Sequence, residues 1–131
     1  MDTLIGFDFG LKRIGVAVGN SLVKIAKPLS IIHANKNNLK FQCIEKLVNE
    51  WDPNKAIVGV PYKVNGTSSD MTIRCKRFAN QLNGRFGLEV ILVDERFSSV
   101  VIERKYGYKI DSDSAVLILQ QYFDTNELSS T

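Results

Sequence analysis

The sequence has 131 residues, of which 44% are hydrophobic and 24% charged, and it carries a formal net charge of +3. This length and composition are typical of one soluble globular domain that needs neither disulfides nor a structural metal to build its core. No apolar run is long enough for a transmembrane helix and no signal-peptide pattern opens the chain, so we expect a cytoplasmic protein without a membrane partner. The small positive charge favours anionic partners only weakly.

Histidine and cysteine content excludes several kinds of active site. His33 is the only histidine, and Cys43 and Cys75 lie too far apart in the sequence to form a metal or redox motif. A zinc site built on histidines is therefore excluded, and a Ser-His-Asp triad would depend on His33 alone. We expect both cysteines to be small buried residues and His33 to lie at the surface.

The first part of the chain predicts an antiparallel meander of three strands. Residues 3–9 and 14–19 are rich in β-branched and aromatic residues, and the tight polar turn at 10–13 between them predicts a hairpin. Residues 28–32 have the same character and predict the third strand.

The remainder of the chain predicts alternating helices and strands. Apolar residues recur every three or four positions over 39–51, 71–86 and 115–123, which predicts three amphipathic helices. The continuous apolar run at 56–60 predicts a strand buried on both faces, and 88–93 predicts the last strand. In the first helix the predicted buried face consists of Leu39, Cys43, Ile44, Leu47, Val48 and Trp51.

Three smaller features complete the predicted structure. Thr67 with Asp70 is expected to cap the second helix, and Ser98 is expected to begin a short extra helix that runs to residue 104. The polar tail from about residue 126 is expected to be disordered. The order βββαβαβα implies a single α/β domain over residues 1–131, with a mixed five-stranded sheet and helices on both faces.

Three acidic residues occupy positions that suit a catalytic site. Asp8 lies within an apolar strand, where a lone carboxylate costs several kcal/mol, by order of magnitude, to bury. Glu95 lies just past the last strand and Asp111 at the start of the last helix, and sites in α/β sheets gather at such positions. If the three acids converge, their oxygen ligands suit Mg²⁺ or Mn²⁺, which can activate water and stabilise a leaving oxygen.

Structural explanations of the same residues stay open on spacing alone. Asp111 could serve only as a helix N-cap, and Glu95 could be a surface acid paired with Arg96. A stripe of arginines along the second helix either contacts phosphates or forms a solvated face; it consists of Arg74, Arg77 and Arg85.

Four motifs, in order along nearly the whole chain, closely resemble the YqgF/RuvX family. They are IGFDFGLKRIGVAV at 5–18, IVGVP at 57–61 with Gly66-Thr67, VDERFSS at 93–99 and IDSDSAVLILQ at 110–120. The family comprises bacterial pre-16S rRNA nucleases that are also described as resembling Holliday-junction resolvases. The resemblance implies a ribonuclease H-like fold and a role in maturing the 5′ end of 16S ribosomal RNA.

The resemblance also implies roles for individual residues. Asp8, Glu95 and Asp111 would form a carboxylate site that binds Mg²⁺ or Mn²⁺ for phosphodiester hydrolysis. Phosphate contacts are expected from Lys12, Arg13 and Arg96, which fall in the matched motifs, and from Arg74 and Arg77 on the second helix.

The chain departs from the family pattern at two places. Asp113 is a second acid where the family usually has a small or apolar residue, so it competes with Asp111 as the third metal ligand. The stretch between Ser99 and Asp111 is also shorter than the basic loop of many members.

The leading hypothesis is a metal-dependent endonuclease that acts on precursor rRNA, free or within a ribosomal particle. The alternatives are a resolvase of the same fold that acts on branched DNA, and a non-catalytic RNA-binding module. The sequence leaves the oligomeric state open.

Overall fold

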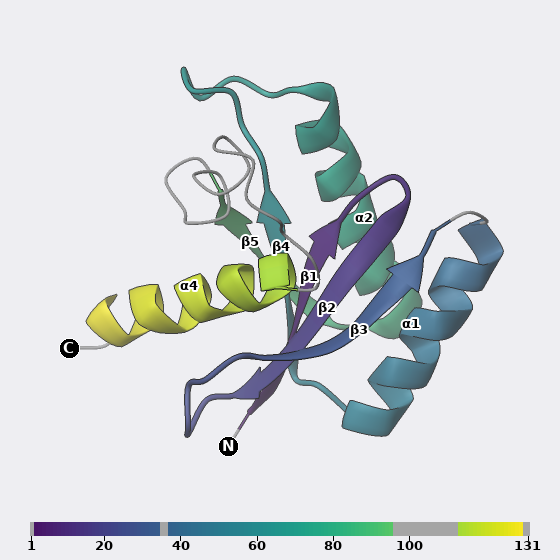
Figure 1. Ribbon diagram of the computed structural model, residues 1–131, viewed down its shortest axis with the longest axis vertical. Helices are drawn as coiled ribbons and strands as arrows, with labels where there is room; N and C mark the ends of the chain where they lie inside the picture. The colour runs from purple at the N-terminus through teal and green to yellow at the C-terminus, as the bar shows by residue number, and fades with distance from the viewer. Residues whose placement is uncertain (1, 35–36, 96–112, 130–131) are drawn as a thin grey trace.

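The computed structural model describes residues 2–34, 37–95 and 113–129. Within these ranges the helices and strands follow the predicted order (Figure 1). They are β1 (Thr3–Phe9), β2 (Arg13–Asn20), β3 (Lys27–His33), α1 (Asn37–Trp51), β4 (Lys55–Val60), α2 (Asp70–Phe86), β5 (Glu89–Asp94) and α4 (Asp113–Ser129).

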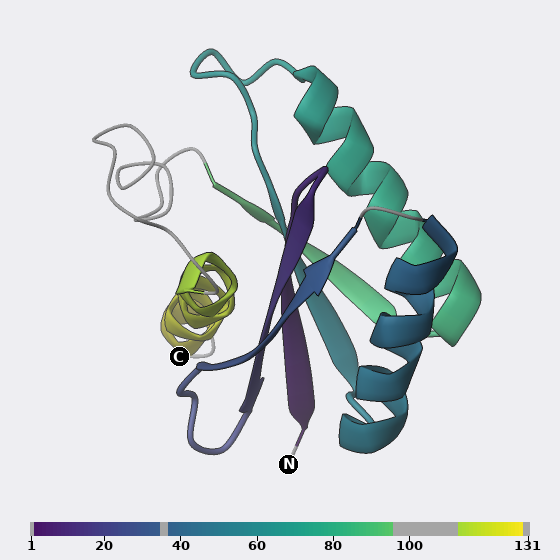
Figure 2. The ribbon, with the colours of Figure 1, turned by 45° about the vertical axis from the view of Figure 1, so that its right-hand side comes forward.

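The strands form one mixed sheet in the order β3-β2-β1-β4-β5. The β1–β2 and β2–β3 pairs are antiparallel, whereas β1–β4 and β4–β5 are parallel. Figure 2 shows α1 and α2 packed on one face of the sheet and α4 on the other. This arrangement confirms the predicted α/β class, and it brings the C-terminal ends of β1, β4 and β5 to the same edge of the sheet.

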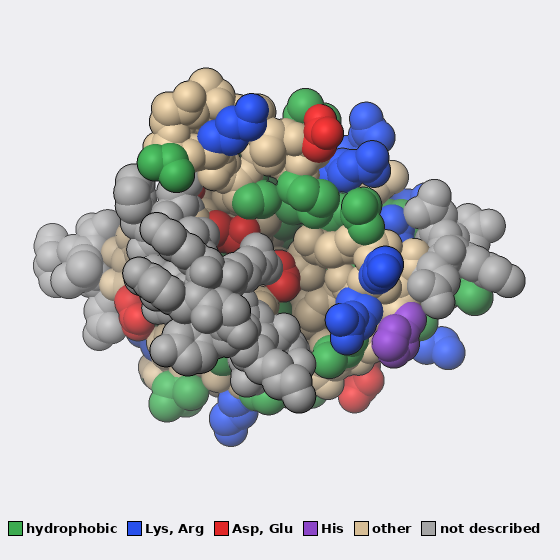
Figure 3. All heavy atoms as spheres, turned by 45° about the horizontal axis from the view of Figure 1, so that its top comes forward, with side chains coloured by type: hydrophobic (Ala, Val, Ile, Leu, Met, Phe, Trp, Pro, Cys, Tyr) green, Lys and Arg blue, Asp and Glu red, His purple; other side chains and the backbone are tan. Residues whose placement is uncertain are grey.

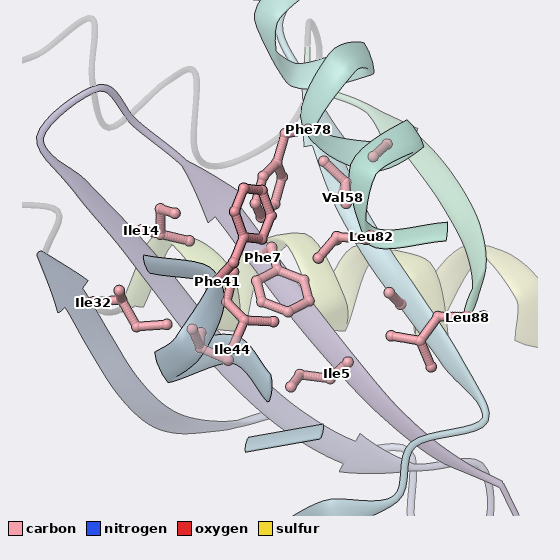
Figure 4. Packing of buried hydrophobic residues seen from close by; sticks show 13 residues of the cluster. Ile5, Phe7, Ile14, Ile32, Phe41, Ile44, Val58, Phe78, Leu82 and Leu88 are labelled. Atoms are coloured by element: carbon pink, nitrogen blue, oxygen red, sulfur yellow. The ribbon is translucent and has the colours of Figure 1, made fainter. Parts of the chain in front are cut away.

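The larger core lies between the sheet and the α1/α2 layer (Figure 4). The ring of Phe78 on α2 packs edge-on against Phe7 and stacks on Phe9, with ring centroids 5.6 and 4.8 Å apart. Buried aliphatic side chains surround these rings, among them Ile5, Ile14, Ile44, Val58 and Leu82. Each fully buried side chain of this size stabilises the fold by about 1.5–3 kcal/mol, which holds the layer firmly on the sheet.

The second core lies beneath α4, on the opposite face of the sheet. Its buried residues are Leu4, Ala17, Ala26, Ile57, Ala115, Ile118, Leu119 and Phe123. The helix approaches β1 closely at Gly6, where a Cβ atom would lie 3.0 Å from the Cβ of Leu119. Side chains alternate along a strand, so Leu4, Gly6 and Asp8 face the α4 side while the residues between them face α1 and α2.

The cap of α2 differs from the prediction. Ser69 is the N-cap: its hydroxyl accepts a hydrogen bond from the Thr72 backbone N–H, and the Thr72 hydroxyl accepts one from the Ser69 N–H. Thr67 instead donates its hydroxyl to Asn65 in the preceding loop. The predicted Thr67–Asp70 cap is wrong because the helix begins at Asp70, one residue after the serine.

The predicted buried face of α1 is confirmed in part: Ile44 is buried, and Leu47 and Val48 pack against the core. The other three predicted residues do not face the core. Cys43 is exposed, Leu39 is 50% exposed and Trp51 is 39% exposed, whereas Phe41 and Lys40 are buried. The face turns toward Phe41 because this ring packs against Phe78 on α2. The predictions of a buried Cys75 and a surface His33 are confirmed.

The last helix is longer than expected. The α4 backbone continues to Ser129, past residue 123, where the predicted helix ends. The disorder of the tail from about residue 126 stays a prediction. The predicted short helix over 98–104 lies outside the described residues. None of the described helices is long and apolar enough to cross a membrane.

Candidate active site

Asp8 lies near the C-terminal end of β1 and points to the α4 side of the sheet. It pairs across the hairpin with Gly15 of β2 and is partly exposed rather than buried. The reason is that α4 covers the earlier part of β1: the Ala115 carbonyl oxygen lies 3.4 Å from where a Cβ on Gly6 would be. Asp8 therefore lies beyond the part of β1 that α4 covers, within reach of solvent.

Glu95 immediately follows β5 and turns inward. Its backbone N–H donates to the Val60 carbonyl at 3.1 Å, which extends the pairing of β5 with β4 by one residue. Only 1% of the residue is exposed. The alternative that Glu95 is a surface acid is therefore wrong. Arg96, its proposed partner in that alternative, lies outside the described residues.

Gly59 of β4 provides the space for the Glu95 carboxylate. A Cβ atom on Gly59 would lie 2.7 Å from Oε1 of Glu95 and 2.5 Å from Cδ1 of Ile118. The sequence prediction missed this residue, although a glycine inside a buried strand is a known signal of close approach by another group.

Asp8 and Glu95 consequently flank Gly59 on one face of the sheet. Gly59 is level with Asp8, one residue beyond the Phe7–Val58 pair of the parallel strands. Adjacent strands lie about 4.8 Å apart, so the backbone of Asp8 lies about one strand spacing from that of Gly59, against which the Glu95 carboxylate packs. The parallel arrangement of β1, β4 and β5 thus brings together two acids that are 87 positions apart in the sequence.

This pair of acids fits a hard divalent cation. Carboxylates that come within about 5 Å of each other repel by about 3 kcal/mol at an effective dielectric near 20, and a cation bound by both offsets that repulsion. Both side chains offer only oxygen ligands, which Mg²⁺ and Mn²⁺ prefer. Because Gly59 has no side chain, the Glu95 carboxylate can pack directly against the β4 backbone.

The third acid cannot be chosen within the described residues, which contain no group of three or more possible metal-ligating side chains. Asp111 lies outside the described residues, and only the backbone of Asp113 is described, as the first residue of α4.

A groove of about 470 Å³ opens beside Asp8. Its lining consists of Asp8, Gly10, Leu11, Lys12, Arg13, Gly15, Ile31 and Met71. Figure 3 shows this end of the molecule, with acidic side chains near its centre and several lysine and arginine side chains to one side of them. Two of the predicted phosphate contacts, Lys12 and Arg13, thus lie in the same groove as the catalytic candidate Asp8.

The arginine stripe of α2 does not join this groove. Arg74 and Arg77 are exposed on α2 and do not line the groove, although Met71 in the first turn of the same helix does. Arg85 stacks on Phe41 of α1, with its guanidinium carbon 4.0 Å from the ring centroid. The stripe therefore divides into exposed residues and one residue that packs between helices.

A buried cation lies beneath the site on the α1/α2 side. The Lys40 ammonium is 5.3 Å from the ring centroids of Phe9 and Phe41. Burial, and secondarily the nearby Arg85 guanidinium, lowers the pKa of Lys40 from its ordinary value. Since Phe9 neighbours Asp8 in β1 but faces the other way, Lys40 supports the back of the sheet and does not enter the groove.

Comparison with known proteins identifies related sequences over most of the chain. Residues 2–125 match the model of the RuvX family, which is described as Holliday junction resolvase. A protein of Paraburkholderia xenovorans named "Putative pre-16S rRNA nuclease" is 48% identical over 128 residues, covering 93% of this chain and 88% of its own. A Bordetella pertussis protein of the same name is 46% identical over 126 residues, covering 95% of both chains.

Solved structures share the fold at low sequence identity. RuvC of Thermus thermophilus in complex with a Holliday junction substrate has a TM-score of 0.57 and 12% identity, covering 97% of this chain and 96% of its own. The Fowlpox virus Holliday junction resolvase has a TM-score of 0.54 and 14% identity, covering 96% of this chain and 99% of its own. These likenesses confirm the predicted ribonuclease H-like fold.

Proposed function

Because this chain belongs to the RuvX family, we propose that it is a nuclease that hydrolyses phosphodiester bonds of precursor 16S rRNA with the help of Mg²⁺ or Mn²⁺. The observation that carries the proposal is the placement of Asp8 and Glu95 on either side of Gly59, on one face of the sheet. The names of its relatives supply the substrate. Such a role places the protein in the cytoplasm, where it meets the RNA free or within a ribosomal particle.

In this proposal each acid has a defined task. Asp8 and Glu95 hold the metal, with Asp111 as the third ligand and Asp113 as the alternative. The metal, when bound, activates water and stabilises the leaving oxygen. Glu95 is held rigidly by burial, whereas Asp8 is partly exposed and meets the substrate directly.

The cations of the β1–β2 turn would bind the substrate backbone. Lys12 and Arg13 line the groove that also contains Asp8, so they would hold phosphates next to the one that is cleaved. Such contacts release counterions, so the affinity for RNA falls as salt is raised. Arg96 is assigned the same role from its place in the family motif.

A cleavage assay with purified protein tests the proposal. Wild type is incubated with precursor 16S rRNA, with precursor ribosomal particles and with four-way junction DNA, each in Mg²⁺, in Mn²⁺ and in EDTA. We expect metal-dependent cleavage of the precursor rRNA, which Asp8→Asn and Glu95→Gln each reduce at least a hundredfold. Matched controls are Asp52→Asn and Glu50→Gln, which change exposed acids at the C-terminal end of α1, away from the site.

The outcomes separate the candidate functions. Cleavage of junction DNA but of neither RNA substrate would assign a resolvase. No cleavage of any substrate by folded protein, together with undiminished RNA binding, would assign a non-catalytic RNA-binding module. Asp111→Asn and Asp113→Asn in the same assay identify the third ligand, because only the true ligand variant should lose activity as completely as Asp8→Asn.

A further inference from the structure

The groove beside Asp8 continues across two more strands. Asp8 pairs with Gly15 of β2, and Gly15 pairs with Ile31 of β3, so the three residues form a row on the α4 side of the sheet. All three line the groove. The floor of the groove therefore leads from the proposed catalytic acid to an aliphatic side chain two strands away.

The groove combines apolar and cationic side chains. Ile31 and Leu11, which line the groove, are 40% and 58% exposed. Lys12 and Arg13, on the turn between β1 and β2, supply positive charge at the same groove. Its volume of about 470 Å³ lies within the range of about 300–1,000 Å³ that small-molecule sites occupy.

This combination suits a nucleotide better than a protein segment. A base presents a flat face that can pack on an apolar side chain, and its phosphate can pair with a lysine or an arginine. The carboxylate of Asp8 at one end of the row would repel a phosphate unless a cation intervened, so the phosphates belong on the Lys12 side or at the metal.

We propose that this groove holds an unpaired nucleotide next to the scissile phosphate, so that the protein selects single-stranded segments of RNA. The base packs on Ile31 and Leu11, and the adjoining phosphate pairs with Lys12 and Arg13. In a duplex the base faces are stacked on their neighbours and cannot make this contact. The inference rests on the proposed function for its substrate, and it adds that the substrate is single-stranded at the cut.

A binding measurement in EDTA tests the inference without any cleavage. Fluorescence anisotropy compares a short single-stranded RNA with a hairpin duplex that contains the same sequence. We expect the single strand to bind wild type at least tenfold more tightly. Ile31→Ala should reduce this affinity about tenfold, because it removes the apolar surface beneath the base.

Matched controls separate the groove from general effects. Ile25→Ala truncates another exposed isoleucine (55% exposed) in the β2–β3 connection, at the opposite end of β3 from the site, and should leave affinity unchanged. Lys12→Gln should lower the salt dependence of binding by about one phosphate contact, whereas Lys27→Gln, at the start of β3, should not. Melting curves confirm that each variant is folded, and Ile31→Val should retain most of the affinity.

Two results would overturn the inference: equal affinity for hairpin and single strand, or wild-type affinity of a folded Ile31→Ala variant. These results are distinguishable from failure of the nuclease proposal. Strand-selective binding that needs Ile31, without cleavage in any metal, would leave the groove in place and refute the nuclease. Metal-dependent cleavage by a protein whose RNA binding does not need Ile31 would support the nuclease and refute the nucleotide groove.

Discussion

Replacing Gly59 with alanine tests whether the Glu95 carboxylate can pack against β4 only because residue 59 has no side chain. The added Cβ would lie 2.5 Å from Cδ1 and 2.9 Å from Cγ1 of Ile118, and 2.7 Å from Oε1 of Glu95. Normal contacts between carbon atoms are about 3.5–4.0 Å, so both neighbours must move by about 1 Å.

The energetic cost follows from the surroundings of the new methyl group. Ile118 is fully buried between α4 and the sheet and Glu95 is 1% exposed, so neither side chain has free space to enter. Overpacking of this kind costs about 1–3 kcal/mol, from which the lower chain entropy of alanine recovers about 0.4–1 kcal/mol. We expect a net loss of about 1–2 kcal/mol in the free energy of unfolding, and a Tm about 4–8 °C lower.

The catalytic effect should exceed the stability effect. A shift of about 1 Å at a catalytic group can cost about a hundredfold in rate, so kcat/KM of Gly59→Ala should fall by one to two orders of magnitude while the protein is still folded at 25 °C. The assay measures urea unfolding and RNA cleavage on the same preparations. Gly84→Ala is the matched control: its Cβ meets nothing within 4 Å in the last turn of α2, so stability should rise by about 0.5–1 kcal/mol with unchanged activity.

A second variant separates the two clashes. Adding Ile118→Val to Gly59→Ala removes the Cδ1 atom and should restore part of the stability, but it leaves the contact with Glu95 and should not restore activity. The reasoning is refuted if Gly59→Ala is as active as wild type, or if the double variant regains activity together with stability.

Three further predictions address the metal, the buried lysine and the end of α2. Mg²⁺ or Mn²⁺ at millimolar concentration should raise the wild-type Tm by mass action, and Asp8→Asn should abolish that rise; an equal rise in both proteins would contradict the proposed site. Because burial and Arg85 lower the pKa of Lys40, the unfolded chain holds more protons than the folded one between that lowered pKa and 10.5. The free energy of unfolding of wild type, relative to that of Lys40→Met, should therefore increase as pH rises through this window and stay constant below it. Urea unfolding at several pH values measures this difference, and a difference that does not change with pH would contradict the lowered pKa of Lys40. Gly87 caps the C-terminal end of α2 with φ 66°, in the left-handed region, where alanine is strained. Gly87→Ala should therefore lower the free energy of unfolding by about 1 kcal/mol in the same urea measurement, and an unchanged unfolding midpoint would contradict this backbone strain.

The order of helices and strands followed from local patterns. The hairpin of β1 and β2 was predictable because its polar turn separates two strand-like runs, and β4 was predictable because five apolar residues follow one another. These signals act over a few residues and do not depend on distant packing. The family motifs then identified the fold, which the comparisons confirm.

Details that depend on neighbouring layers were less predictable. The buried face of α1 turned toward Phe41 and Lys40 because α2 brings Phe78 and Arg85 to that side. The cap of α2 at Ser69 was missed because several hydroxyl-bearing residues precede the helix. Which of them is the N-cap depends on the residue at which the helix begins. In both cases the sequence permits alternatives of similar local quality, and tertiary contacts decide between them.

The same division holds for the candidate active site. The sequence alone determined that any metal ligands must be oxygens, because the chain has a single histidine and no paired cysteines, and it singled out Asp8 and Glu95 by their places at strand ends. Only the tertiary structure decided that the two lie across Gly59, because that requires the register of β1, β4 and β5. Strand register and side-chain alternation are properties of the assembled sheet, since a shift of one residue would turn either acid to the opposite face.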